Sequence, residues 1–156
     1  MSYALAQIAV GVAVERRPAK SPWSQELWRP VSVFAGIPSA KAWTIIDSSA
    51  EATTFYAGEA LIELFRTETA NYCSNLAMRP PLLWVILRSI PRDPGMELRG
   101  VTADPAEGEA LTGSGTDLVE TVPMPTSIGR QLQAFIAEHH IDRPMYKRQR
   151  DRTGQS

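Results

Sequence analysis

The sequence predicts an α+β fold, mainly an antiparallel β-sheet or a partly closed barrel of six to seven strands, with a C-terminal amphipathic helix. Three observations predict this class. β-branched residues alternate with small residues over residues 8–15, six apolar residues follow one another over residues 82–87, and apolar side chains recur at a helical spacing over residues 127–139. The first two patterns are typical of strands, and the third is typical of a helix that packs one face on a core.

The first half of the chain is predicted to form strands separated by turns. The first strand covers residues 8–15, and the second covers residues 28–34. Pro30 lies near the start of the second strand and cannot donate to a ladder, so we expect that end at a sheet edge. Gly58 is expected to break the chain between two later strands. Two further strands of this half are expected at residues 42–46 and 53–56. Residues 61–66 also fit a helical spacing, and we favour a strand there.

The second half begins with a short helix over residues 69–77, which the prolines at positions 80 and 81 end. The apolar run at residues 82–87 predicts a strand buried on both faces, at the centre of the sheet. Residues 103–115 are rich in glycine, alanine and acids, so we expect a mobile acidic loop with one helical turn that starts at Asp104. Two more strands are expected, at residues 96–102 and 118–122.

The C-terminal helix over residues 127–139 is the clearest element. Thr126 or Ser127 is expected to cap its first N–H groups. Five side chains fall on one continuous face of this helix, Ile128, Leu132, Phe135, Ile136 and His139.

The chain has 156 residues, which corresponds to one domain, and we assign residues 1–142 to it. Residues 143–156 form a basic tail that we expect to be flexible. From residue 141 onward, five basic side chains stand against two acids, a net charge of +3. Residues 93–120 hold seven acids against one arginine, a net charge of −6. The overall charge of −1 argues against a dedicated nucleic-acid-binding protein.

The single cysteine, Cys73, cannot form an internal disulfide, and nothing in the sequence indicates an oxidising compartment. The apolar stretch at residues 3–14 has no basic residue before it and is too short to span a bilayer. We therefore expect a cytoplasmic protein without a transmembrane segment.

No candidate catalytic, cofactor-binding or metal-binding residue stands out. His139 and His140 are adjacent, so on a helix they point in different directions and do not share a ligand. Cys73 has no base near it in sequence, and we expect it to be a small, half-buried residue of a helix. The glycine-rich stretch at residues 113–116 lacks the lysine of a phosphate loop.

Two segments are candidates for binding a partner. Trp23, Trp28 and Arg29 surround a short polar loop, and tryptophan and arginine dominate the energetics of protein interfaces. Exposed, they would form a binding patch; buried, they would anchor the loop on the core. The tail supplies the second candidate set, Tyr146, Lys147, Arg148 and Arg150.

The tail has three possible roles in this interpretation. It is a solubilising end, or it docks on an acidic surface, or it contacts nucleic acid or anionic lipid. The acidic surface would belong to residues 93–120 of the same chain or to a partner. A net charge of +3 gives only weak, salt-sensitive attraction to phosphates.

Several motifs are spread over nearly the whole chain. They are GVAVERR at residues 11–17, SPW at 21–23, WRPV at 28–31, RTET at 66–69, NL at 75–76, VPMP at 122–125, HH at 139–140, RP at 143–144 and YKR at 146–148. Together they resemble a proteobacterial family of unknown function. Its members are often encoded near genes for molybdenum-dependent formate dehydrogenase and iron–sulfur proteins, and some are linked to molybdopterin-guanine-dinucleotide synthesis. The resemblance implies a role beside a redox enzyme.

These observations lead to one main hypothesis and two alternatives. The main hypothesis is a non-enzymatic accessory or assembly protein that binds a larger molybdenum or iron–sulfur enzyme and itself needs no cofactor. The first alternative is a cofactor-handling enzyme of molybdenum cofactor maturation that uses Cys73, His139 and His140. The second is a weak nucleic-acid or membrane binder that acts through the basic tail.

Overall fold

The computed structural model describes residues 4–140 of the chain. The expected basic tail, with Tyr146, Lys147, Arg148 and Arg150, lies outside the described residues. The elements follow one another as β1 (Ala6–Arg17), β2 (Leu27–Ala35), β3 (Thr44–Ser48), β4 (Thr53–Leu64), η1 (Arg66–Glu68), α1 (Thr69–Leu76), β5 (Leu82–Ser89), β6 (Met96–Thr102), α2 (Pro105–Thr112), β7 (Leu118–Pro123) and α3 (Thr126–His139).

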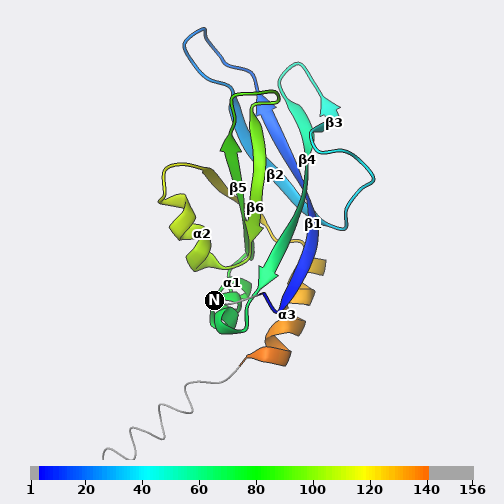
Figure 1. Cartoon of the computed structure of the whole chain (residues 1–156), viewed down its shortest axis with the longest axis vertical. Coiled ribbons are helices and arrows are strands. Elements are labelled where there is room, and N and C mark those ends of the chain that lie inside the picture. The colour runs from blue at the N-terminus through cyan, green and yellow to red at the C-terminus, as the bar shows by residue number, and fades with distance from the viewer. Residues whose placement is uncertain (1–3, 141–156) are drawn as a thin grey trace, which may run out of the picture.

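Seven antiparallel strands of the described region form two sheets (Figure 1). The first sheet has the order β2-β1-β4-β3 and the second has the order β6-β5-β7. Strand β4 lies beside β6, and β2 lies beside β7, so the two sheets face each other across a shared core. The prediction of a mainly antiparallel fold with a C-terminal helix is confirmed. The strands nevertheless form two sheets and no closed barrel, because no ladder joins β4 to β6 or β2 to β7 in residues 4–140.

Strand β4 corrects the prediction of two short strands broken at Gly58. It is a single strand of 12 residues paired with β1 along its length. Val12 of β1 faces Gly58, and Ala13 faces Tyr56, so Ala57 is an extra residue in β4. Gly58 has a φ of 125°, which side-chain-bearing residues rarely adopt. The glycine therefore allows a β-bulge and does not end the strand.

The edges of the first sheet follow the sequence less closely. Strand β2 is an edge strand, as Pro30 predicted. Strand β3 begins at Thr44, two residues later than expected, because Trp43 has a φ of 71° and turns the chain into the strand. All five residues of β3 are exposed.

Strand β5 lies at the centre of the second sheet, as its apolar run predicted. Leu83, Val85 and Leu87 point into the core, and the alternate residues Trp84 and Ile86 are buried on the other face. The core also receives alternate residues of β1 and β4 together with three residues of α3, namely Ile8, Val10, Val12, Val14, Ile62, Leu64, Ile128, Leu132 and Phe135.

The predicted mobile acidic loop at residues 103–115 is a helix over most of its length, α2. The Asp104 side chain accepts hydrogen bonds from the N–H groups of Ala106 and Glu107, as an N-cap does. Gly108 packs against the indole ring of Trp84, so α2 covers the outer face of β5. The acids of this stretch are carried on a packed element.

Helix α3 buries Ile128, Leu132 and Phe135 and leaves His139 partly exposed against the Phe135 ring. The expected cap by Thr126 or Ser127 is wrong. Pro125 occupies the N-cap position, and no side chain caps the helix. Thr126 and Ser127 are the first two residues of the helix itself, past the N-cap position from which a hydroxyl group accepts from the N–H groups of the first turn.

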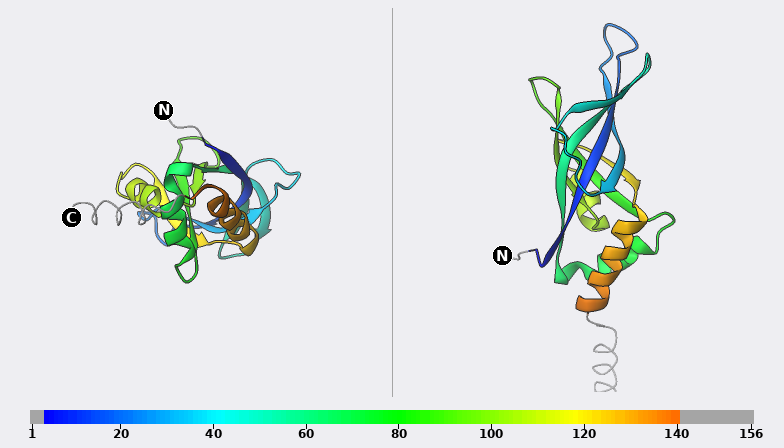
Figure 2. Two further views of the ribbon diagram at one scale, coloured as in Figure 1. Left: turned by 90° about the horizontal axis from the view of Figure 1, so that it is seen from below. Right: turned by 90° about the vertical axis from the view of Figure 1, so that its right-hand side faces the viewer.

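The molecule is elongated, and its two ends differ (Figures 1 and 2). The loop between β1 and β2 and the turn between β5 and β6 lie at one end, while α1 and the end of α3 lie at the other. No helix within residues 4–140 is long and apolar enough to cross a membrane.

Candidate functional site

Trp23 lies in the loop that joins β1 to β2, and its side chain is 88% exposed. The loop is closed locally by two serines. The N–H of Ser24 donates to the carbonyl oxygen of Ser21 (3.2 Å), and the N–H of Ser21 donates to Oγ of Ser24 (3.0 Å). These bonds form a turn around Pro22 and Trp23 that keeps the indole ring in solvent.

Trp28 has a different environment, although it lies only five residues further along the chain. Its ring stacks on Phe55 with centroids 5.9 Å apart and meets Trp43 edge-on at the same distance. The guanidinium of Arg16 lies over the Phe55 ring, 5.1 Å from its centroid. Trp28 is thus part of an aromatic cluster that fastens β2 and the start of β3 to β4.

The sequence left open whether these tryptophans are exposed for binding or buried as anchors, and the structure shows one of each. Trp23 is the exposed residue, and Trp28 is the anchor. Arg29 is exposed, and its Nε lies 3.4 Å from Oε1 of Glu15, which also pairs with Arg17 at 2.8 Å. Leu27 of the same hairpin is 59% exposed. The β1–β2 hairpin presents two large apolar side chains flanked by ion-paired arginines.

The histidines and the cysteine form no metal-binding cluster within residues 4–140. Nδ1 of His140 lies 2.8 Å from Oγ1 of Thr69, a buried residue at the start of α1. His139 stacks on Phe135 with ring centroids 4.6 Å apart. Cys73 is exposed, so the expectation of a half-buried residue is wrong. Position 73 lies on the solvent side of α1, between the buried residues Tyr72 and Asn75.

A groove that sequence reasoning missed runs over β4, β5 and β6 and along α2. It consists of two adjoining cavities of about 360 and 590 Å³. Four residues line both cavities, Glu63, Phe65, Thr102 and Glu107. Apolar side chains form part of the wall of the smaller cavity, Leu61, Phe65, Ile86, Val101 and Leu111.

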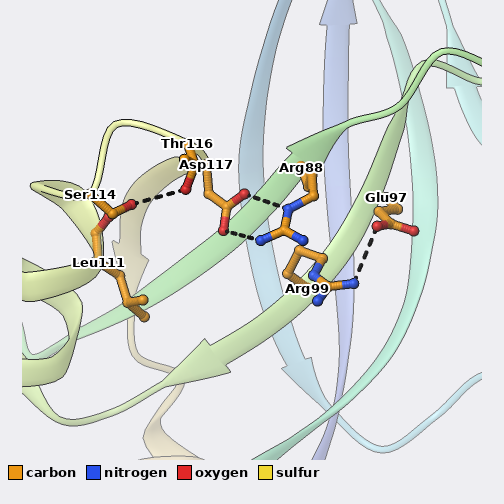
Figure 3. A network of polar contacts seen from close by, with 7 residues as sticks. All are labelled: Arg88, Glu97, Arg99, Leu111, Ser114, Thr116 and Asp117. Atoms are coloured by element: carbon orange, nitrogen blue, oxygen red, sulfur yellow. Dashed lines mark hydrogen bonds and ion pairs between the residues drawn. The ribbon is translucent and has the colours of Figure 1, made fainter.

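One end of this groove holds two arginines (Figure 3). Arg88 donates twice to the carboxylate of Asp117, at 2.7 and 3.1 Å. Arg99 lies beside Arg88 and pairs with Glu97 at 3.3 Å. The hydrogen bonds from Arg88 lower the pKa of Asp117, and the same bonds raise the pKa of Arg88.

The other end of the groove is acidic and lies against α1. Nδ2 of Asn71 donates to Oε2 of Glu68 (2.9 Å) and to Oδ1 of Asp104 (3.0 Å), which holds the two carboxylates together. Burial, together with the negative charges of Asp104, Glu68 and Glu107, raises the pKa of Tyr72 to about 12, against a lowering hydrogen bond from the N–H of Phe65. Tyr72 lines the larger cavity beside these carboxylates.

Comparison with protein families identifies the chain. The model of a family described as a protein of unknown function, DUF3305, matches residues 9–150. The chain belongs to this family. No curated protein and no solved structure matches it. The expected resemblance to a family of unknown function is confirmed at that level.

The DUF3305 match includes the Trp23 hairpin and the whole groove. It also continues past the end of α3 and ends at Arg150. Ten residues of the chain beyond the described region therefore belong to the family's common sequence. The match therefore includes the first part of the basic segment, as far as Arg150.

Sequence reasoning missed the groove because its residues come from separate segments. Arg88 and Asp117 are 29 positions apart and become neighbours only when β5 pairs with β7. The sequence signal for the groove was the excess of acids over residues 93–120. It indicated an acidic segment, but it did not indicate a cavity.

Proposed function

We propose that this DUF3305 protein is a non-enzymatic accessory or assembly protein that binds a protein partner through the β1–β2 hairpin. One observation carries the proposal: Trp23 is 88% exposed on a turn that its neighbours hold closed. A tryptophan buries about 150–250 Å² when it is covered, and leaving that area in water is unfavourable. Residues of this type supply the largest share of the binding energy in protein interfaces.

The hydrogen-bonded turn supports the same proposal. A loop whose backbone is already held in one conformation loses less conformational entropy when a partner covers it. Arg29 adds a charged group on the same hairpin, and it is 60% exposed beside Glu15. Trp28 contributes indirectly, because the aromatic cluster fixes the strand on which Arg29 lies.

The partner we propose is a larger redox enzyme that contains molybdenum or an iron–sulfur cluster, in the cytoplasm. The support for this identity is the family resemblance described above. The tail residues Tyr146, Lys147, Arg148 and Arg150 require a separate proposal, because α3 ends at the opposite end of the molecule from the hairpin (Figure 1).

Affinity capture from cells that naturally produce the protein tests this function. The full chain and Trp23→Ala are captured in parallel, and the recovered proteins are quantified by mass spectrometry. We expect at least one partner whose recovery falls more than tenfold in Trp23→Ala, because a hot-spot residue contributes about 2–4 kcal/mol.

Ile37→Ala is the matched control, since Ile37 is an exposed apolar residue outside the hairpin. It should leave recovery unchanged. Equal recovery of every captured protein by the wild type and Trp23→Ala would show that the hairpin is not the binding surface.

A further inference from the structure

The groove over β4, β6 and α2 is bounded by two strands that lie side by side without a ladder between them. Among the described residues, β6 pairs only with β5, and the second half of β4 pairs only with β1. The two strands lie too close together for a further strand to pair between them, so an occupant lies over them and contacts side chains. The apolar part of the groove wall is available for such contacts.

The charge of the groove is unbalanced. Five acids line its two cavities, Glu63, Glu68, Asp104, Glu107 and Asp117. Only two basic residues, Arg88 and Arg99, stand against them, so the lining has a net charge of −3. An occupant with a net positive charge is favoured.

The described chain ends beside the acidic end of this groove. Nδ1 of His140 contacts Oγ1 of Thr69, and Thr69 follows Glu68 directly. Glu68 lines the larger cavity. Residue 141 therefore starts within a few residues' length of the groove.

The segment that starts there has the required chemistry. It carries five basic side chains against two acids, a net charge of +3, together with Met145 and Tyr146. The family match includes it as far as Arg150. Ten extended residues reach about 33 Å, whereas a strand of seven residues such as β6 spans about 23 Å. The segment is long enough to follow the groove from end to end.

We propose that residues 141–152 of this chain dock in the groove between β4, β6 and α2. The basic side chains of Lys147, Arg148 and Arg150 face the acids Glu63 and Glu107, and Tyr146 packs on the apolar wall. This contact is independent of the Trp23 hairpin, which stays free at the other end of the molecule for its partner.

A paramagnetic label on the full chain tests the proposal. Thr116→Cys in a Cys73→Ser background places a single nitroxide beside the arginine end of the groove, because Thr116 is exposed and precedes Asp117. We expect the amide signals of residues 146–150 to weaken at least twofold at low salt. They should recover at high salt, since the Debye length falls from about 30 Å at 0.01 M to about 3 Å at 1 M.

Charge reversal in the groove provides the matched comparison. Glu63→Lys with Glu107→Lys should restore the signals of residues 146–150. Glu59→Lys with Glu109→Lys is the control, because these exposed glutamates lie on the same strand and helix outside the groove. The control should leave the weakening intact.

Two results would overturn the proposal. Signals of residues 146–150 that are equally strong with and without the label would show that the segment does not occupy the groove. Weakening that appears only between a labelled molecule and an isotope-labelled second molecule would assign the groove to another copy of the chain.

Discussion

The ion pair of Arg88 and Asp117 shows how single residues organise the groove. Arg88 comes from β5 and Asp117 precedes β7, so their two hydrogen bonds link the central strand to the loop that follows α2. Because the bonds are made to the ionised carboxylate, they hold the pKa of Asp117 below its ordinary value of 3.8. The pair thus both positions Arg88 and makes the stability of the loop depend on pH.

The pH dependence of this pair has a definite sign. A carboxylate whose pKa is lowered by folding stabilises the folded state above its unfolded pKa and loses that contribution as the pH falls through the folded value. We therefore expect Asp117→Asn to be less stable than the wild type at neutral pH, with a difference that shrinks below about pH 4. Urea denaturation of both proteins over this range measures it. A difference that stays constant with pH would contradict the assignment, and Glu120→Gln, an exposed carboxylate of β7, serves as the control.

Replacing each of the two tryptophans of the hairpin by alanine should change the free energy of unfolding by different amounts. Trp23→Ala should change the free energy of unfolding by less than about 0.5 kcal/mol, because its ring is exposed. Trp28→Ala should lower it by about 3 kcal/mol, since the ring packs on Phe55 and Trp43. Thermal and urea unfolding measure both. Equal effects would show that the aromatic cluster does not hold the hairpin.

Sequence reasoning could not have separated these two residues. It placed Trp23, Trp28 and Arg29 around one short polar loop and left both the exposed and the buried arrangement open. The difference depends on Trp43 and Phe55, which pack on Trp28 from segments 15 and 27 residues away. Contacts over such separations leave no trace in a local pattern.

At the scale of elements, local patterns predicted most of the fold. The apolar run of β5, the alternation of β1 and the helical spacing of α3 all identified elements that the structure contains. Each signal is local, and each agrees with the burial of the residues that produced it. The centre of the second sheet and the edge position of β2 also followed from single features of the sequence.

The errors at this scale arose where a residue has two possible roles. Gly58 can end a strand or form a bulge. It forms a bulge because β4 pairs with β1 on both sides of it. The acid-rich stretch at residues 103–115 looked like a solvated loop, but Asp104 caps a helix that packs on Trp84. In both cases a tertiary contact determined the local structure.

The packing of α2 gives a direct test at the element scale. A Cβ atom at Gly108 would overlap ring atoms of Trp84, whereas one at Gly100 would meet nothing within 4 Å. Gly108→Ala should lower the free energy of unfolding by roughly 1–3 kcal/mol through overpacking. Gly100→Ala should leave it unchanged or raise it by about 0.5 kcal/mol. If the two variants were equally stable, α2 would not be fixed on β5 as described.

At the scale of the whole molecule, the two ends are built from different elements. The β1–β2 hairpin lies at one end, and α1 and the end of α3 lie at the other (Figures 1 and 2). The groove is lined by residues of β4, β5, β6 and α2. Trp23 and Arg29, two of the residues that the sequence put forward for partner binding, are exposed on the hairpin, and their binding role stays a prediction. The groove could not be predicted, because strands from two sheets and a helix must come together to form it.

The central claim is that the hairpin binds a protein, and site-specific photo-cross-linking in cells that naturally produce the protein tests it most directly. Trp23 is replaced by the photoreactive residue p-benzoyl-phenylalanine, and Ile37 is replaced in the same way as a control. The account predicts a covalent adduct with one partner protein from position 23 and none from position 37. The absence of an adduct at position 23, or the same adducts at both positions, would contradict it.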